Sequence, residues 1–114
     1  MPSPAAHSLI ELELGRIREL SRCGRHREAL NAAEELAVAA LQSRDALYLI
    51  AANQRCLNRI DEALATLQRL EQQHPRFSLL YQERGYCHTS LRDAPLVIKA
   101  FLEAVNLNPA LATS

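Results

Sequence analysis

The sequence predicts an all-α protein, a superhelical stack of three helix-turn-helix units with about six helices and no strands. Two observations predict this fold class. The first is composition: 48% of the 114 residues are apolar, but only 4% are aromatic and only three are glycine. A core built mainly of Ala, Leu, Ile and Val, with few glycines, favours helix over strand. The second observation is an internal repeat, whose period of about 34 residues is typical of stacked helical hairpins.

The repeat is marked by Pro75 and Pro109, which stand one period apart and close similar segments. The same interval divides the chain into units at residues 10–43, 44–77 and 78–111. Residues 1–9 are then an N-terminal segment that leads into the first helix, and residues 112–114 are a tail or the start of a continuation. Stepping by one period brings apolar residues into four columns: Ala29, Ala63 and Val97; Leu30, Leu64 and Ile98; Ala33, Leu67 and Phe101; Leu36, Leu70 and Ala104.

Each unit is expected to hold two amphipathic helices, because its apolar residues recur at steps of three and four. Gly24, Asn58 and Arg92 mark the breaks, and Gly and Asn accept the left-handed conformation that ends many helices. Asp93 can cap the last helix, with Pro95 in its first turn. We expect helices near residues 9–22, 26–42, 45–57, 60–73, 79–91 and 94–107. One such hairpin cannot bury both of its apolar stripes, so the units must stack.

The third unit resembles the tetratricopeptide repeat (TPR) through Tyr81, Arg84, Gly85, Leu91, Val97, Phe101, Ala104 and Pro109. The second unit resembles it through Leu47, Ala51, Leu57, Ala63, Leu67 and Pro75. The first unit diverges, with Ile17 where the family has a small residue and Leu41 where it has proline. The resemblance implies that two helices approach closely at Gly85. It also implies that Tyr81 is a packing residue.

The same resemblance implies a concave groove lined by the first helix of each unit. The groove-facing positions are then Glu11, Leu14, Arg18, Ser21, Arg22, Asp45, Tyr48, Ala52, Arg55, Cys56, Leu79, Gln82, Tyr86, Thr89 and Ser90. The family's clamp for carboxylate termini is not reproduced, since Leu14 and Arg18 replace residues that it needs.

Within this groove, six residues are the candidate partner-binding set: Arg18, Arg22, Tyr48, Arg55, Gln82 and Tyr86. The three guanidinium groups could hold an acidic peptide or a carboxylate. Alternatively, they form a solvated face paired with Glu11, Glu19 or Asp45. The two tyrosines could add recognition contacts, or they could be partly buried between units.

No catalytic site, metal site or cofactor site is predicted. Cys87 and His88 are adjacent, but adjacent residues on a helix point about 100° apart, so they do not form a nucleophile–base pair. The number of cysteines is odd, and no two of them form a CxxC motif. This argues against a disulfide framework and a zinc site, and it favours location in the reducing cytoplasm.

Charge and hydropathy limit the classes of binding partner that we expect. The 13 basic and 13 acidic residues balance, so nucleic acid is not the expected partner. The sequence has no long apolar segment and no signal peptide, so no membrane partner is predicted. A protein or peptide is the expected partner.

Three functions remain open. The first is a scaffold that binds a peptide or partner protein in the groove. The second follows from a resemblance of residues 46–49, 57–64 and 80–85 to the repeat region of bacterial TPR-containing sulfotransferases, which implies an accessory domain whose sulfuryl-transfer chemistry lies beyond Ser114. The third is self-association into a homodimer through the C-terminal repeat end, where Ile98, Phe101 and Val105 have no capping helix over them.

Overall fold

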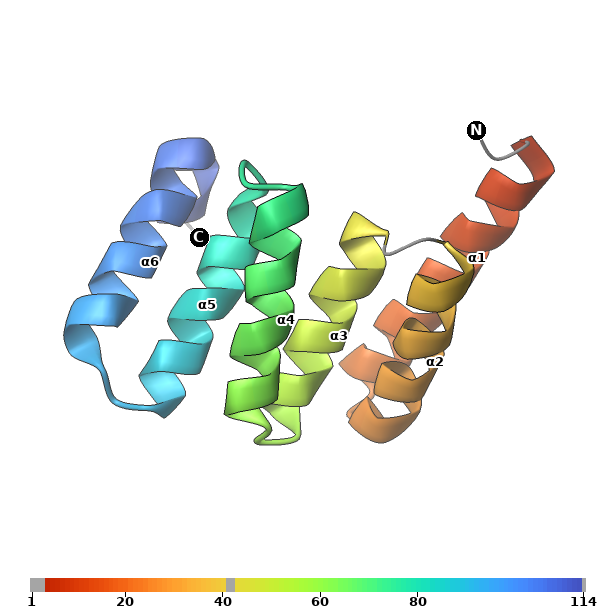
Figure 1. The fold of residues 1–114 in the computed structure, drawn as a ribbon, viewed down its shortest axis with the longest axis horizontal. Coiled ribbons are helices and arrows are strands. Elements are labelled where there is room, and N and C mark those ends of the chain that lie inside the picture. The colour runs from red at the N-terminus through yellow and green to blue at the C-terminus, as the bar shows by residue number, and fades with distance from the viewer. Residues whose placement is uncertain (1–3, 41–42, 114) are drawn as a thin grey trace.

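The computed structural model describes residues 4–40 and 43–113, and within these residues it contains six α-helices, one short 3-10 helix and no strand (Figure 1). The all-α prediction is therefore confirmed. The helices are α1 (Pro4–Arg22), α2 (His26–Ala39), α3 (Arg44–Cys56), α4 (Ile60–Gln73), α5 (Ser78–Ser90), α6 (Ala94–Leu107) and the 3-10 helix η1 (Pro109–Thr113).

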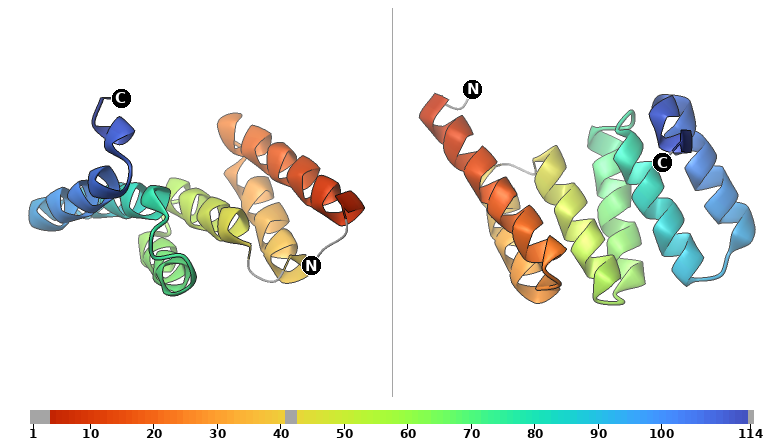
Figure 2. Two further views of the ribbon diagram at one scale, coloured as in Figure 1. Left: turned by 90° about the horizontal axis from the view of Figure 1, so that it is seen from above. Right: turned by 180° about the vertical axis from the view of Figure 1, so that it is seen from behind.

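The helices form three hairpins that lie side by side along the long axis of a molecule measuring 43 × 27 × 25 Å (Figure 1). Viewed from behind, α1, α3 and α5 lie in front, with α4 behind them (Figure 2). Helix α1 contacts α3, and α3 contacts α5. Helices α2 and α4 each pack against the first helix of the following hairpin, α3 and α5 respectively. Each hairpin therefore completes the core of its neighbour.

The turn inside each hairpin recurs with the period of the sequence. Gly24, Asn58 and Arg92 have φ values of 81°, 63° and 58°, in the left-handed region. The amide of the residue after each one donates to the carbonyl five positions back. The three bonds are Arg25 to Leu20 at 2.9 Å, Arg59 to Gln54 at 2.8 Å and Asp93 to His88 at 3.0 Å. This is the Schellman pattern of helix ends. The sequence repeat is therefore also a backbone repeat.

The core consists of small and branched aliphatic side chains, as the composition predicts. Its largest fully buried members include Leu14, Ile17, Leu47, Leu67 and Leu80. Small alanine side chains, among them Ala33, Ala51 and Ala63, are buried in the same core.

Gly85 lies where α5 and α6 approach each other closely. A Cβ atom placed on Gly85 would lie 2.5 Å from Cε1 of Phe101, so a side chain at this position would displace the ring. The close approach expected at Gly85 is confirmed. Tyr81 is also buried, and its hydroxyl donates to the carbonyl of Pro75 at 2.6 Å.

The expected boundaries of α3 to α6 agree with the structure to within one residue. Helix α1 differs: it begins at Pro4, so most of the segment 1–9 is helical. Proline is compatible with the first helical position because its missing N–H group would have no partner there. Helix α2 ends at Ala39, and residues 41–42 of the expected helix lie outside the described residues.

Asp93 caps the N-terminus of α6 as predicted, since its side chain accepts a hydrogen bond from the amide of Leu96 at 3.3 Å. The chain then turns into η1, which packs against α6 and includes residues 112 and 113 of the expected tail. Residue 114 lies outside the described part of the chain.

Candidate functional site

The candidate site lies on the side of α3 and α5 that is not covered by α2 or α4. We call this surface the α3–α5 face and define it by side chains from the two helices and the residue before α5. Its members are Arg44, Tyr48, Arg55, Phe77, Gln82 and Tyr86. Four of them belong to the predicted partner-binding set, and Arg44 and Phe77 do not.

At the C-terminal end of α3, Arg55 is paired with Glu83 of α5, whose carboxylate is 2% exposed. The guanidinium group also lies over the ring of Tyr86, 5.1 Å from its centroid. Burial alone would lower the pKa of Arg55, but the hydrogen bond and charge of Glu83 outweigh this effect and raise it. The positive charge of Arg55 is therefore largely balanced by Glu83.

At the N-terminal end of α3, Tyr48 packs edge-on against Phe77, with ring centroids 5.8 Å apart. Arg44 lies over the ring of Phe77, with its guanidinium carbon 4.4 Å from the centroid. Burial, followed by the negative charge of Glu83, raises the pKa of the Tyr48 hydroxyl above its usual range. Tyr48 thus combines partial burial between hairpins with a position on the open face.

Tyr86 is the most accessible aromatic residue of the face, with 40% of its surface exposed. Its ring packs edge-on against Phe101 of α6, with centroids 5.6 Å apart. Gln82 lies one turn earlier on α5 and is half-buried. Ring contacts with Arg55 and Phe101 hold Tyr86 in place while part of the ring stays open.

The two arginines of α1 that belong to the predicted partner-binding set are arranged differently from Arg55. Arg22 forms an ion pair with Glu19, with Nε donating to Oε2 at 3.0 Å, and both side chains are exposed. This pairing is the alternative that the sequence left open. Arg18 is exposed on the same helix. The prediction that Leu14 faces the groove is wrong. Leu14 is 1% exposed, because it packs into the core with Ile17.

A polar junction that the sequence did not predict joins the first two hairpins. The side chain of Asn53 is buried, and its Oδ1 accepts from Ser21 Oγ at 3.1 Å. His26 Nδ1 lies 2.8 Å from the same oxygen, and Asn53 Nδ2 donates to the carbonyl of Leu49 at 2.8 Å. Because Nδ2 is already committed to that carbonyl, Oδ1 requires a donor, which assigns the proton of the imidazole to Nδ1. This junction is a structural element, since Asn53 is enclosed.

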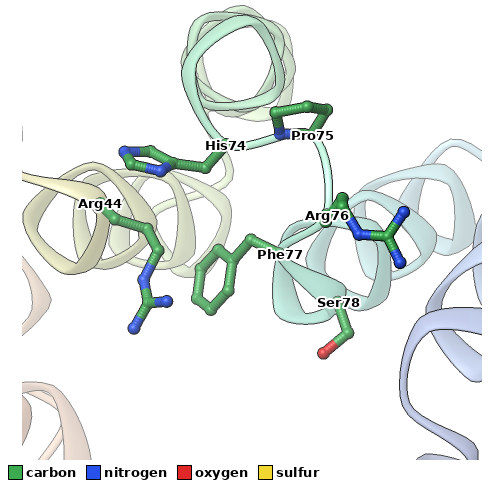
Figure 3. Close-up of a pocket in the computed structure, with 6 residues that line it drawn as sticks. All are labelled: Arg44, His74, Pro75, Arg76, Phe77 and Ser78. Atoms are coloured by element: carbon green, nitrogen blue, oxygen red, sulfur yellow. The ribbon is translucent and has the colours of Figure 1, made fainter.

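A hollow of ≈ 400 Å³ opens where the N-terminal end of α3 meets the loop between α4 and α5 (Figure 3). The sequence does not reveal this hollow, because loop residues are not marked by helical periodicity. The lining residues are Arg44, His74, Pro75, Arg76, Phe77 and Ser78. The hollow shares Arg44 and Phe77 with the α3–α5 face, so the two form one continuous surface.

The cysteines are free; Cys23 and Cys56 are exposed and Cys87 is buried. Burial, followed by the charge of Glu83, raises the pKa of the Cys87 thiol to about 11. Such a thiol is a poor nucleophile at neutral pH. Within residues 4–40 and 43–113, no three His, Cys, Asp or Glu side chains gather as metal ligands would.

None of the described helices has the length and apolar character needed to cross a membrane. No family model, curated protein or solved structure matches this chain.

Proposed function

We propose that this chain is a TPR-type interaction module that binds an extended segment of a partner protein along the α3–α5 face. The sequence repeat, the three equivalent helix ends and the close packing at Gly85 support the class. The face supports the binding role, because arginine and tyrosine are enriched at the centres of protein interfaces.

The observation that carries the proposal is the pair of arginine–aromatic stacks at the two ends of the face. Arg44 stacks on Phe77 at one end, and Arg55 stacks on Tyr86 at the other. Arg44 and Arg55 are eleven residues apart on α3, which places the two guanidinium-bearing positions about 16 Å apart along the helix axis. About five residues of an extended peptide span a similar length. The side chains are fixed by their neighbours, so a ligand would lose little free energy in ordering them.

The proposal is tested by selecting linear peptides from a random display library on the immobilised chain. The affinities of the selected peptides are then measured by fluorescence polarisation for wild type and for Gln82→Ala and Tyr86→Ala. The matched control is Gln68→Ala, because Gln68 is exposed on α4. We expect Tyr86→Ala to weaken binding about tenfold or more, as interface tyrosines commonly do, and Gln68→Ala to leave it unchanged.

Circular dichroism of each variant separates lost binding from lost folding. If no peptide is selected, or if folded Tyr86→Ala binds the selected peptides as tightly as wild type, the α3–α5 face is not the binding surface.

A second candidate function, self-association, is supported by the outer surface of α6. Ile98 and Leu102 are 61% and 58% exposed there, and Leu91 in the preceding turn is also exposed. Ile98 and Leu102 lie on one side of the helix, since they are spaced by four. The position equivalent to Ile98 in the second unit is Leu64, and in the first unit it is Leu30, which is buried. The exposed surface of α6 is therefore equivalent to surfaces of α2 and α4 that are covered in the first two hairpins.

The opposite edge of the stack is less suited to cover α6 of another copy. Helix α1 exposes Leu9 and Leu12, but the ion pairs Glu13–Arg16 and Glu19–Arg22 also lie on this helix. We therefore propose an antiparallel pairing of α6 with α6 of a second copy, which closes as a symmetric dimer. Light scattering over a concentration series tests it. We expect a dimer that Ile98→Glu abolishes, and a monomer at high concentration in wild type would rule out the pairing.

A further inference from the structure

The hollow beside α3 carries a local excess of positive charge in a chain whose formal net charge is zero. Arg44 and Arg76 line it, and no carboxylate is among its lining residues. Arg76 is exposed and forms no ion pair with any residue in the described ranges 4–40 and 43–113. Arg44 is paired with the neighbouring Asp45 at 3.3 Å, and both side chains are open to solvent. Such an exposed pair contributes little stability, so a ligand can replace it at small cost.

The aromatic ring of Phe77 lies in the middle of this charged lining. Arg44 and Arg76 lie on either side of Phe77, and the hydroxyl group of Ser78 points away from His74 and Pro75 (Figure 3). The ring is half-buried and is held by the edge-on contact with Tyr48. It can therefore support an apolar group, with the guanidinium group of Arg44 beside the ring. The guanidinium group of Arg76 points away from the ring and can bind an acidic group farther along the same segment (Figure 3).

The wall of the hollow is held in place by hydrogen bonds. The amide of Phe77 donates to the carbonyl of His74 at 3.1 Å, and the Tyr81 hydroxyl donates to the carbonyl of Pro75 at 2.6 Å. Arg84 reinforces the same end of α4 through an ion pair with Glu71 at 2.9 Å. These contacts fix the loop between α4 and α5 before a ligand arrives, which reduces the entropy lost on binding.

We propose that this hollow binds an acidic peptide segment, with one carboxylate on Arg44, a second on Arg76 and an apolar side chain on Phe77. The proposal rests on the proposed function and names the chemistry of the partner. Arginine suits this role because its planar group binds a carboxylate through two parallel hydrogen bonds. The hollow's volume of ≈ 400 Å³ is within the range of about 300–1,000 Å³ that ligand pockets commonly have.

The test uses the full chain and two fluorescein-labelled peptides of seven residues. The acidic peptide has glutamates on both sides of a central leucine, and the control peptide has glutamine at each of those positions. Binding is measured by fluorescence polarisation at low and physiological salt, for wild type, Arg44→Gln and Arg76→Gln. The matched control variant is Arg27→Gln, because Arg27 is exposed on α2.

We expect the acidic peptide to bind at least tenfold more tightly than the glutamine peptide, and its affinity to fall with salt. Arg44→Gln and Arg76→Gln should each weaken binding about fivefold or more, whereas Arg27→Gln should change it less than twofold. Free glutamate and inorganic phosphate should compete only at far higher concentrations, because they lack the contact with Phe77.

Four results would overturn the proposal. Equal affinity for the two peptides would show that charge is not recognised. Equal losses in Arg27→Gln and Arg76→Gln would show that the attraction is non-specific. Competition by inorganic phosphate as strong as by the acidic peptide would identify a simple anion site. If neutral display-selected peptides bind in a Tyr86-dependent manner while the acidic peptide does not bind, this proposal fails and the α3–α5 face remains a binding surface.

Discussion

Glu83 of α5 is enclosed between hairpins, and its carboxylate is paired with the guanidinium group of Arg55 on α3. The pair spans the junction between the second and third hairpins, where Arg55 also contacts the ring of Tyr86. A buried pair of this kind fixes the register of two surfaces, because each charge is costly to bury alone.

Removing one member of this pair should therefore be more harmful than removing both. We expect Arg55→Leu to lower the free energy of unfolding by about 2–4 kcal/mol, since it leaves the carboxylate of Glu83 buried without a partner. The double variant Arg55→Leu with Glu83→Leu should recover much of that loss. Urea unfolding followed by circular dichroism measures the free energy of unfolding of the single and the double variants. A double variant as unstable as the sum of the single variants would show that the two charges are not coupled.

The contact between Gly85 and Phe101 predicts opposite effects for two glycine substitutions. Gly85→Ala places a Cβ atom 2.5 Å from the Phe101 ring and should destabilise the chain by about 1–2 kcal/mol, despite the better helix propensity of alanine. Gly15→Ala is the matched control, because no atom lies within 4 Å of its Cβ position on α1. It should stabilise the chain by about 0.5–1 kcal/mol. Thermal unfolding of both variants distinguishes them, and a stabilising Gly85→Ala would contradict the close packing.

The three equivalent turns predict that glycine is the best residue at each of them. Arg92 has a φ of 58°, which costs a residue with a Cβ atom about 1 kcal/mol. Arg92→Gly should therefore stabilise the chain by about 0.5–1 kcal/mol, whereas Gly24→Ala should destabilise it by a similar amount. Arg59→Gly is the control, because Arg59 has a φ of −97° and gains nothing from glycine. If Arg92→Gly and Arg59→Gly shift the melting temperature equally, backbone strain at Arg92 is not the cause.

The cysteines should react in two classes. The exposed thiols of Cys23 and Cys56 should react rapidly with a thiol reagent at pH 8, whereas Cys87 should react only when the chain unfolds. The native chain should therefore show two reactive thiols and the unfolded chain three. Rapid modification of Cys87 in the native state would show that α5 and α6 open readily.

Cys87 also predicts a loss of stability in alkali. Its pKa in the folded chain is about 11, above the ordinary value of 9.0. Stability is therefore complete below pH 9 and falls as the pH rises towards 11, because only the unfolded thiol ionises readily. The decrease should approach about 1 kcal/mol per pH unit. Cys87→Ala should lack this component, which a comparison of urea unfolding at pH 8 and pH 10 measures.

The sequence predicted the helices well because their determinants are local. Gly24, Asn58 and Asp93 act through their own backbone or the next turn, so their effects follow from residue type and spacing. The close approach at Gly85 could be predicted only from the resemblance to repeats that have a small residue at this position. Helix α1 begins five residues before the expected start near residue 9, because Pro4 fits the first helical position and the residues after it continue the helix.

The site was predicted less completely because its chemistry depends on contacts between hairpins. The resemblance implies that Arg55 faces the open side of α3, but it does not show that Glu83 neutralises the charge of Arg55. Leu14 had the expected position for a groove residue, yet the core of the first hairpin encloses it. Arg44 stands at the start of the second unit and Arg76 near its end, and only the folded stack brings both to one hollow.

The pattern of helix contacts has a consequence for how stability is distributed along the chain. Helices in the described residues contact their neighbours in sequence or the next-but-one helix, so the stack behaves as a row of coupled units. The hairpin of α3 and α4 contacts a hairpin on both sides, whereas α6, among the elements that the structure describes, contacts only α5 and η1. Local opening should therefore begin at the α6 end, and amide hydrogen exchange should be slowest in the middle hairpin. The proposed ligand surface includes residues of the second hairpin and of the third. A bound peptide would therefore contact both hairpins and stabilise the packing of the third hairpin on the second.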